Sequence, residues 1–304
     1  MIKIAMPVDD SMTQINQEIR DNHLEWFSKY RTDFENLKEQ ENFGYNIEDF
    51  LFGDYNKMCQ IIKDIGEITD VVRRESYQKV FNYTNFASRT KEWDTYKFIE
   101  KLNIKVCPYC NMEDLILMEK GNRSFKPHLD HYFNKNKYPY FSVSLYNLIP
   151  SCSDCNTKFK TTKDFYKTES IYPYLEQYGT DGNFNVSNIS LEKLISMKPI
   201  SETDIKVDLV INENSSYYKK ILYSSNTFLI EERYNNQKSF IANILNNIRF
   251  YSSSYLESIK KDLGLPEIEE IKRSLIMLPP KDEELYNNKF SKLCCDIAKQ
   301  YKLL

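Results

Sequence analysis

Glycine and proline are scarce in this sequence of 304 residues, which contains 7 glycines and 10 prolines. Both residues interrupt helices, and residues that favour helices dominate most of the chain. The sequence also lacks any run of about 20 apolar residues, the length that a membrane-spanning helix needs. Residues 1–10 contain no apolar stretch long enough for a signal peptide. We therefore expect a mostly helical, soluble and cytoplasmic protein with no membrane partner.

An overall excess of positive charge is also absent, because the formal net charge is -3. The charge is unevenly distributed, however. Residues 101–167 hold 11 lysines and arginines against 6 aspartates and glutamates, so the rest of the chain is acidic. A basic segment within an acidic body is what local binding of phosphate requires. An ordinary solvated charged surface would explain the same count.

Cysteine is infrequent, but four of the 7 cysteines form two Cys-x-x-Cys pairs, Cys107–Cys110 and Cys152–Cys155. In an intracellular protein, such pairs more often bind metal than form disulfides. Thiolates at i and i+3 can both reach one Zn²⁺ at about 2.3 Å, and two pairs complete a tetrahedron. Four protein ligands leave no open position, so we predict a structural zinc. Redox chemistry and simple packing are the alternatives, and packing is the role expected for Cys59, Cys294 and Cys295.

The sequence between and around these pairs resembles the HNH endonuclease family. The resemblance is carried by the order Asp130-His131, Asn147 and Asn156, the last within a Cys-x-x-Cys-Asn-x-Lys element. The Cys-Pro-Tyr-Cys opening, Asp-His-Tyr-Phe and Asn-Leu-Ile-Pro-Ser-Cys are most similar to the HNH nucleases of bacterial anti-phage systems, the Septu-type and retron-associated effectors. The helical flanks carry no such resemblance.

The resemblance implies a ββα-metal fold, with a hairpin and a helix around the site. His131 matches the general base that takes a proton from water, a task suited to a neutral imidazole. Asp130 matches the carboxylate that holds Mg²⁺ or Mn²⁺ at the scissile phosphate. Asn147 matches the asparagine that orients the base, and Asn156 stands where many members have a final histidine. An amide oxygen at Asn156 can still ligate a hard cation.

Each of these residues also has a simpler interpretation. Asp130 and His131 could form an ordinary hydrogen-bonded pair at a strand end, and Asn147 could be a turn residue. For His128, contact with phosphate and support of Asp130 are both open, because strand alternation puts it on the same face as Asp130. Further lysines could contact backbone phosphates or simply be exposed: Lys135, Lys158 and Lys160.

We expect three regions: an N-terminal helical region at 1–104, an HNH module with the Cys₄ zinc site at 105–175, and a mainly helical C-terminal region at 176–304. The fold class is therefore mostly α with a small central α+β module. Within the last region, residues 205–211 are apolar and β-branched enough for a strand. Residues 214–251 are expected to form one long helix.

The resulting hypothesis is a metal-dependent HNH endonuclease that hydrolyses phosphodiester bonds in DNA, with RNA not excluded. The family implies products with 5′-phosphate and 3′-hydroxyl ends. It also implies an anti-phage defence effector, with an ATPase or other regulatory protein encoded nearby as partner. The rival hypothesis is a non-catalytic zinc module that binds nucleic acid or a protein.

Overall fold

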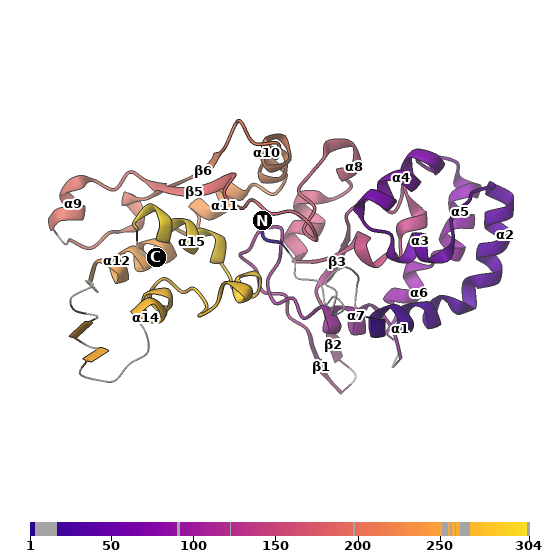
Figure 1. The fold of residues 1–304 in the computed structure, drawn as a ribbon, viewed down its shortest axis with the longest axis horizontal. Coiled ribbons are helices and arrows are strands. Elements are labelled where there is room, and N and C mark those ends of the chain that lie inside the picture. The colour runs from indigo at the N-terminus through magenta and orange to yellow at the C-terminus, as the bar shows by residue number, and fades with distance from the viewer. Residues whose placement is uncertain are drawn as a thin grey trace.

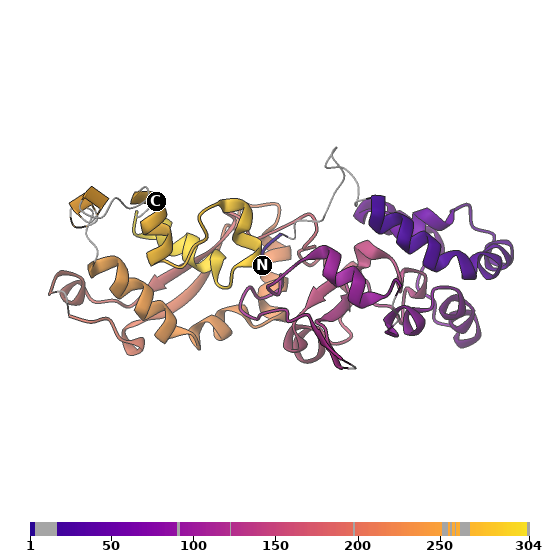
Figure 2. The ribbon, with the colours of Figure 1, turned by 90° about the horizontal axis from the view of Figure 1, so that it is seen from below.

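The computed structural model describes residues 1–3, 17–89, 92–121, 123–196, 198–250, 255, 257–258, 260–261 and 268–302. The N-terminal helices lie at one end of an elongated molecule and the C-terminal segments at the other (Figures 1 and 2). The segment with the two cysteine pairs lies between these ends. No helix of the described residues is both long enough and apolar enough to cross a membrane.

The N-terminal helices begin where short polar side chains accept hydrogen bonds from the first-turn backbone N–H groups. Asn46 forms a capping box with Asp49, while Asp54 and Asp94 each cap a later helix. Their apolar faces meet in an aromatic core, in which Phe34 and Phe50 are fully buried. The helices are α1 (Gln17–Phe27), α2 (Arg31–Glu41), α3 (Ile47–Phe52), α4 (Tyr55–Ile65), α5 (Val71–Val80), α6 (Tyr83–Ala87) and α7 (Thr95–Leu102).

The central segment contains two small antiparallel sheets. Strands β1 (Met118–Lys120) and β2 (Arg123–Phe125) form an exposed hairpin. Strand β3 (His128–His131) pairs with β4 (Leu148–Ser151), and a π-helical turn, Asp154–Lys160, then packs against β3. The short helix α8 (Phe165–Thr168) follows. Of the residues that the sequence singled out, Asp130 and His131 lie on β3, Asn147 directly precedes β4, and Asn156 lies in the π-helical turn.

The C-terminal third is built on a third two-stranded sheet, of β5 (Gly182–Ser187) and β6 (Lys206–Ile211). Burial alternates along β5, because Phe184 and Val186 face the core while the residues between them are half-buried. The helices of this part are α9 (Leu191–Ser196), α10 (Tyr218–Thr227), α11 (Ile230–Asn235), α12 (Lys238–Phe250), α14 (Ile268–Leu275) and α15 (Ser291–Gln300).

The predicted fold class is confirmed at the level of a mostly helical chain with small antiparallel sheets, and the strand predicted at 205–211 is present as β6. The prediction of one helix over 214–251 is wrong. The chain leaves helical geometry at Leu229, which has a φ of 47°, and again between α11 and α12. Left-handed backbone is costly for a residue with a side chain, so packing imposes the break. The last residue of the predicted helix, residue 251, lies outside the described residues.

Candidate functional site

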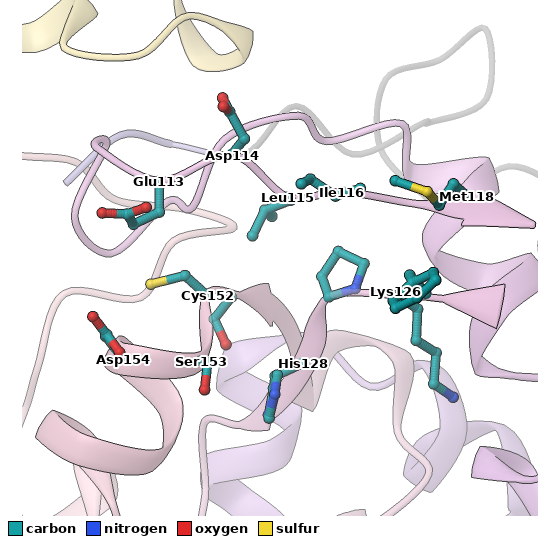
Figure 3. A pocket seen from close by; sticks show the side chains of 13 residues that line it. Glu113, Asp114, Leu115, Ile116, Met118, Lys126, His128, Cys152, Ser153 and Asp154 are labelled. Atoms are coloured by element: carbon teal, nitrogen blue, oxygen red, sulfur yellow. The ribbon is translucent and has the colours of Figure 1, made fainter. Parts of the chain in front are cut away.

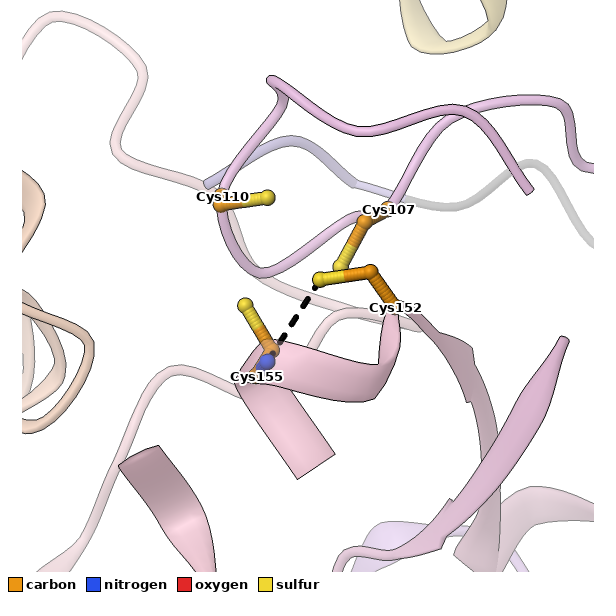
Figure 4. Close-up of side chains that lie close together, drawn as sticks. All are labelled: Cys107, Cys110, Cys152 and Cys155. Carbon is orange, nitrogen blue, oxygen red and sulfur yellow. Dashed lines mark hydrogen bonds between the residues drawn. The ribbon is translucent and has the colours of Figure 1, made fainter. Parts of the chain in front are cut away.

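The two cysteine pairs come together at one buried point. Cys107 and Cys110 lie on the turn before β1, Cys152 follows β4, and Cys155 lies in the turn Asp154–Lys160 (Figure 4). All four are buried, and their sulfur atoms lie within 4.8 Å of one another. Tetrahedral Zn–S bonds of about 2.3 Å place sulfur atoms about 3.8 Å apart. The four thiols therefore fit a metal ion such as zinc.

The sulfur atoms of Cys152 and Cys155 accept hydrogen bonds from their surroundings. Arg233 donates a hydrogen bond to the Sγ of Cys155 at 3.4 Å, and the backbone N–H of Cys155 donates to the Sγ of Cys152 at the same distance. Hydrogen bonds among the sulfur atoms lower the pKa of Cys110 and Cys152, whereas burial raises that of Cys107 and Cys155. Arg233 offsets negative charge as an outer partner of the ligands.

Both segments that carry the cysteines also reach Asp130 on β3. Tyr109, inside the first pair, donates its hydroxyl to Asp130 Oδ2 at 2.6 Å. Lys160, at the end of the turn that carries Cys155, donates its ammonium to Asp130 Oδ1 at 2.8 Å and to the carbonyl of His131 at 2.5 Å. The cysteine cluster thus fixes the two groups that hold the Asp130 carboxylate.

The divalent-ion site predicted from Asp130 and Asn156 is not formed in this arrangement. Both oxygens of Asp130 are engaged and its side chain is 4% exposed, while that of Lys160 is 2% exposed. The amide of Asn156 faces His128 instead, with Nδ2 3.2 Å from the imidazole Nδ1. A hard cation needs several oxygen ligands with free lone pairs around one space. The side chains of Asp130 and Asn156 do not offer such a set of oxygen ligands while Lys160 is present.

His131 ends β3 and is held in one orientation. Its Nε2 lies 2.9 Å from the carbonyl oxygen of Ser142, so this nitrogen carries the proton that the carbonyl accepts. Its Nδ1 has no hydrogen-bond partner among the described residues, and the residue keeps 8% exposure. Burial, with smaller effects of Lys135 and Lys160, lowers the pKa of His131 to about 3. The ring is therefore neutral, with an unpaired lone pair on Nδ1.

His23 provides a comparison within the same chain. Its Nε2 also lies 2.9 Å from a carbonyl oxygen, that of Val143, and burial lowers its pKa to about 3. Unlike His131, however, its Nδ1 accepts a hydrogen bond from the Trp93 indole at 3.0 Å. Both nitrogens of His23 are thus satisfied, as expected for a structural residue. His131 differs by one open acceptor.

Asn147 links the segments on either side of His131. Its side chain accepts from the N–H of Phe133 at 2.7 Å and donates to the carbonyls of Phe133 and Phe141. Phe141 immediately precedes Ser142, whose carbonyl holds the imidazole of His131. The buried amide is therefore more than a turn residue, because it fixes the backbone that orients the histidine.

His128 faces the solvent from the start of β3. A pocket of about 410 Å³ is lined by His128, Asn156, Lys126, Lys135 and Tyr83, among others. The ammonium of Lys135 lies 4.7 Å from the centre of the Tyr83 ring, and the His131 ring packs on Tyr83 in a T-shaped arrangement with the ring centres 4.5 Å apart. Burial lowers the pKa of both lysines. The pocket thus places two lysines around Tyr83, whose ring contacts His131.

Figure 3 shows a second pocket, of about 480 Å³. Lys126, Pro127 and His128 line both pockets. Ile116, which precedes β1, and Met118 and Phe125 of the β1–β2 hairpin give it an exposed apolar wall, and acidic residues including Asp154 lie along it. His128 therefore stands between a basic pocket and an apolar one.

The predicted phosphate contacts divide into two groups. His128 and Lys135 share the basic pocket. Lys158 is exposed and pairs with Asp154, and Lys160 is buried against Asp130, so the phosphate contact predicted for Lys160 is wrong for this arrangement. Sequence reasoning missed Lys126, Tyr83 and Tyr109. Only Tyr109 carried a usable signal, because it lies inside the first cysteine pair.

No protein-family model, no curated protein and no solved structure matches this chain. The candidate site is therefore defined by the geometry of this chain alone, as a buried four-cysteine centre beside an oriented histidine and a basic pocket.

Proposed function

We propose that this chain is an endonuclease of the HNH type, which hydrolyses phosphodiester bonds in DNA with His131 as the general base. One observation carries the proposal. The imidazole of His131 is neutral and fixed through Nε2, while Nδ1 has no partner among the described residues. A purely structural histidine in this chain, His23, has both nitrogens satisfied.

The chemistry needs a group that removes a proton from water and a positive surface that receives the phosphate. A His131 pKa of about 3 keeps the imidazole in its basic form at cellular pH, although it also makes the imidazole a weak base. A phosphate anion beside the ring would raise this pKa, because opposite charges favour the imidazolium form. Lys126 and Lys135 give suitable charge to the pocket that Tyr83 also lines, and Tyr83 contacts His131.

A structural zinc on the four cysteines is part of the proposal and would supply no chemistry to the reaction. The two segments that carry the cysteines also carry Tyr109 and Lys160, which hold Asp130 beside His131. The resemblance implies magnesium or manganese at Asp130 and Asn156. Asp130 could take up such an ion only if Lys160 left it, and no step is assigned to the ion. The roles of defence effector and of ATPase-regulated partner likewise rest on the resemblance alone.

The rival function is a zinc module that binds nucleic acid without cutting it. The observation that favours it is the occupied Asp130 carboxylate, which leaves no free carboxylate oxygen beside His131. This rival retains the basic pocket but has no need for the open acceptor on His131.

Nicking of supercoiled plasmid, with Mg²⁺ or Mn²⁺ and with an EDTA control, distinguishes the two. The proposal predicts that the parent nicks DNA and that His131→Ala loses at least about 100-fold in rate, as for a missing general base. His131→Ala should keep its zinc content and its affinity for DNA, because lysines supply that affinity. His23→Ala is the matched control, and it should lose stability while any folded fraction still nicks DNA.

Absence of nicking by the parent, with single- and double-stranded DNA and RNA all tested, would favour the binding module. Equal rates for the parent and His131→Ala would remove His131 from the chemistry.

A further inference from the structure

The ammonium of Lys160 sits where a cation bound to Asp130 would have to sit. It lies 2.8 Å from Asp130 Oδ1 and 2.5 Å from the carbonyl oxygen of His131. Two oxygens of this kind, one carboxylate and one carbonyl, are typical ligands of a hard metal ion. Tyr109 occupies the other carboxylate oxygen at 2.6 Å.

Lys160 is also held firmly in this position. Its side chain is 2% exposed, and its ammonium lies 4.8 Å from the centre of the Phe165 ring. The turn that carries it is fixed to the four-cysteine centre through Cys155. If Lys160 left this position, the buried carboxylate of Asp130 would lose its only cationic partner among the described residues, which is costly.

We propose that Lys160 is a built-in cation that excludes divalent metal from Asp130, so that the parent protein binds no Mg²⁺ or Mn²⁺ there. The inference deepens the proposed function and rests on it, because the HNH resemblance is what assigns a metal ion to Asp130. It concerns the metal requirement of the proposed nuclease. Removing the ammonium while keeping the carboxylate creates a metal site from Asp130 and the His131 carbonyl.

The substitution Lys160→Gln provides this change. The amide is shorter than the lysine side chain and carries no charge, so a cavity with uncompensated negative charge is left beside Asp130. Mn²⁺ is the suitable probe, because it prefers oxygen ligands and ranks below Zn²⁺ for thiolate sites. It therefore leaves a zinc on the four cysteines in place.

Binding is measured by electron paramagnetic resonance of free Mn²⁺ titrated into zinc-loaded protein. The parent and Lys160→Arg, which keeps the charge, should show no Mn²⁺ bound at Asp130. Lys160→Gln should bind about one Mn²⁺ with a dissociation constant on the order of 0.1–1 mM, the range of weak oxygen-ligand sites. Asp130→Asn added to Lys160→Gln should abolish this binding.

A matched control lies in the C-terminal part of the chain. Lys292 forms a similar buried ion pair with Asp296, at 2.6 Å and with side-chain exposures of 10% and 1%. Lys292→Gln also leaves a buried carboxylate without its cation. It should not create a Mn²⁺ site like that of Lys160→Gln, because Asp296 accepts a hydrogen bond from the backbone N–H of Phe184. This control separates a specific cation position from a general effect of a stranded charge.

If Lys160→Gln is too unstable for titration, its melting temperature with and without Mn²⁺ gives the same information, since a bound ion stabilises the fold. A rise seen in Lys160→Gln and absent in the double variant supports the proposal.

Two results would overturn it: Mn²⁺ binding by the parent that Asp130→Asn removes, or no Mn²⁺ effect in folded Lys160→Gln. Nicking assays are independent of both. A metal site that appears without cleavage by any variant would reject the nuclease and leave the role of Lys160 intact.

Discussion

Acid should weaken this fold through its two buried histidines, His23 and His131. Burial lowers the pKa of each to about 3, whereas a histidine in an unfolded chain titrates near 6.5. Below pH 6.5 these two histidines therefore bind protons in the unfolded chain but not in the folded chain. The stabilisation is complete above pH 6.5 and is lost progressively as the pH falls from 6.5 toward 3.

The expected loss is about 2 kcal/mol for each histidine between pH 7.5 and pH 5. Urea denaturation at these two pH values, in the parent and in His131→Gln, measures it. Acid also loosens thiolate–zinc bonds, but this affects both proteins, so the difference between them isolates His131. His131→Gln should lose about 2 kcal/mol less stability on acidification than the parent. An equal loss in both proteins would refute the burial argument for His131.

Three further predictions concern the metal, the orientation of His131 and the basic pocket. Cys152→Ser should lose the metal and lower the melting temperature of the whole central segment, and elemental analysis should find about one zinc in the parent; zero zinc in parent protein purified without chelators would contradict this. Asn147→Ala should cost about 1–3 kcal/mol in urea denaturation, because buried backbone groups lose their partners, and it should slow cleavage more than His23→Ala does. Joint replacement of Lys126 and Lys135 by alanine should lower the salt dependence of DNA binding by about two units of slope, and an unchanged slope would place phosphate elsewhere.

The cysteine cluster could be predicted from sequence because a four-thiolate site depends on residue type and short spacing, whatever chain separates the pairs. The strand at 205–211 was similarly readable from its β-branched run. Its partner strand β5 could not be predicted in this way, because the asparagines and glycine of Gly182–Ser187 are typical of turns. Pairing with β6 and burial of Phe184 and Val186 override that local preference.

The environment of the candidate site was less predictable than its residues. The sequence indicated Asp130 and His131, but the partners of Asp130 come from segments 21 and 30 residues away. Such contacts depend on how the cysteine centre folds the chain, which no local pattern encodes. For Lys160 the sequence leaves phosphate contact and simple exposure open, and neither describes its buried position against Asp130. No local pattern indicated the π-helical turn that carries Lys160 inward.

Chemical rescue tests the role of His131 most directly. In His131→Ala the missing imidazole can be replaced by free imidazole from solution, provided that the cavity beside Tyr83 admits it. The account predicts that added imidazole restores plasmid nicking in His131→Ala in proportion to its neutral form, and leaves the parent and His23→Ala unaffected. A nicking rate of His131→Ala equal to that of the parent without imidazole would contradict the claim that His131 is the general base.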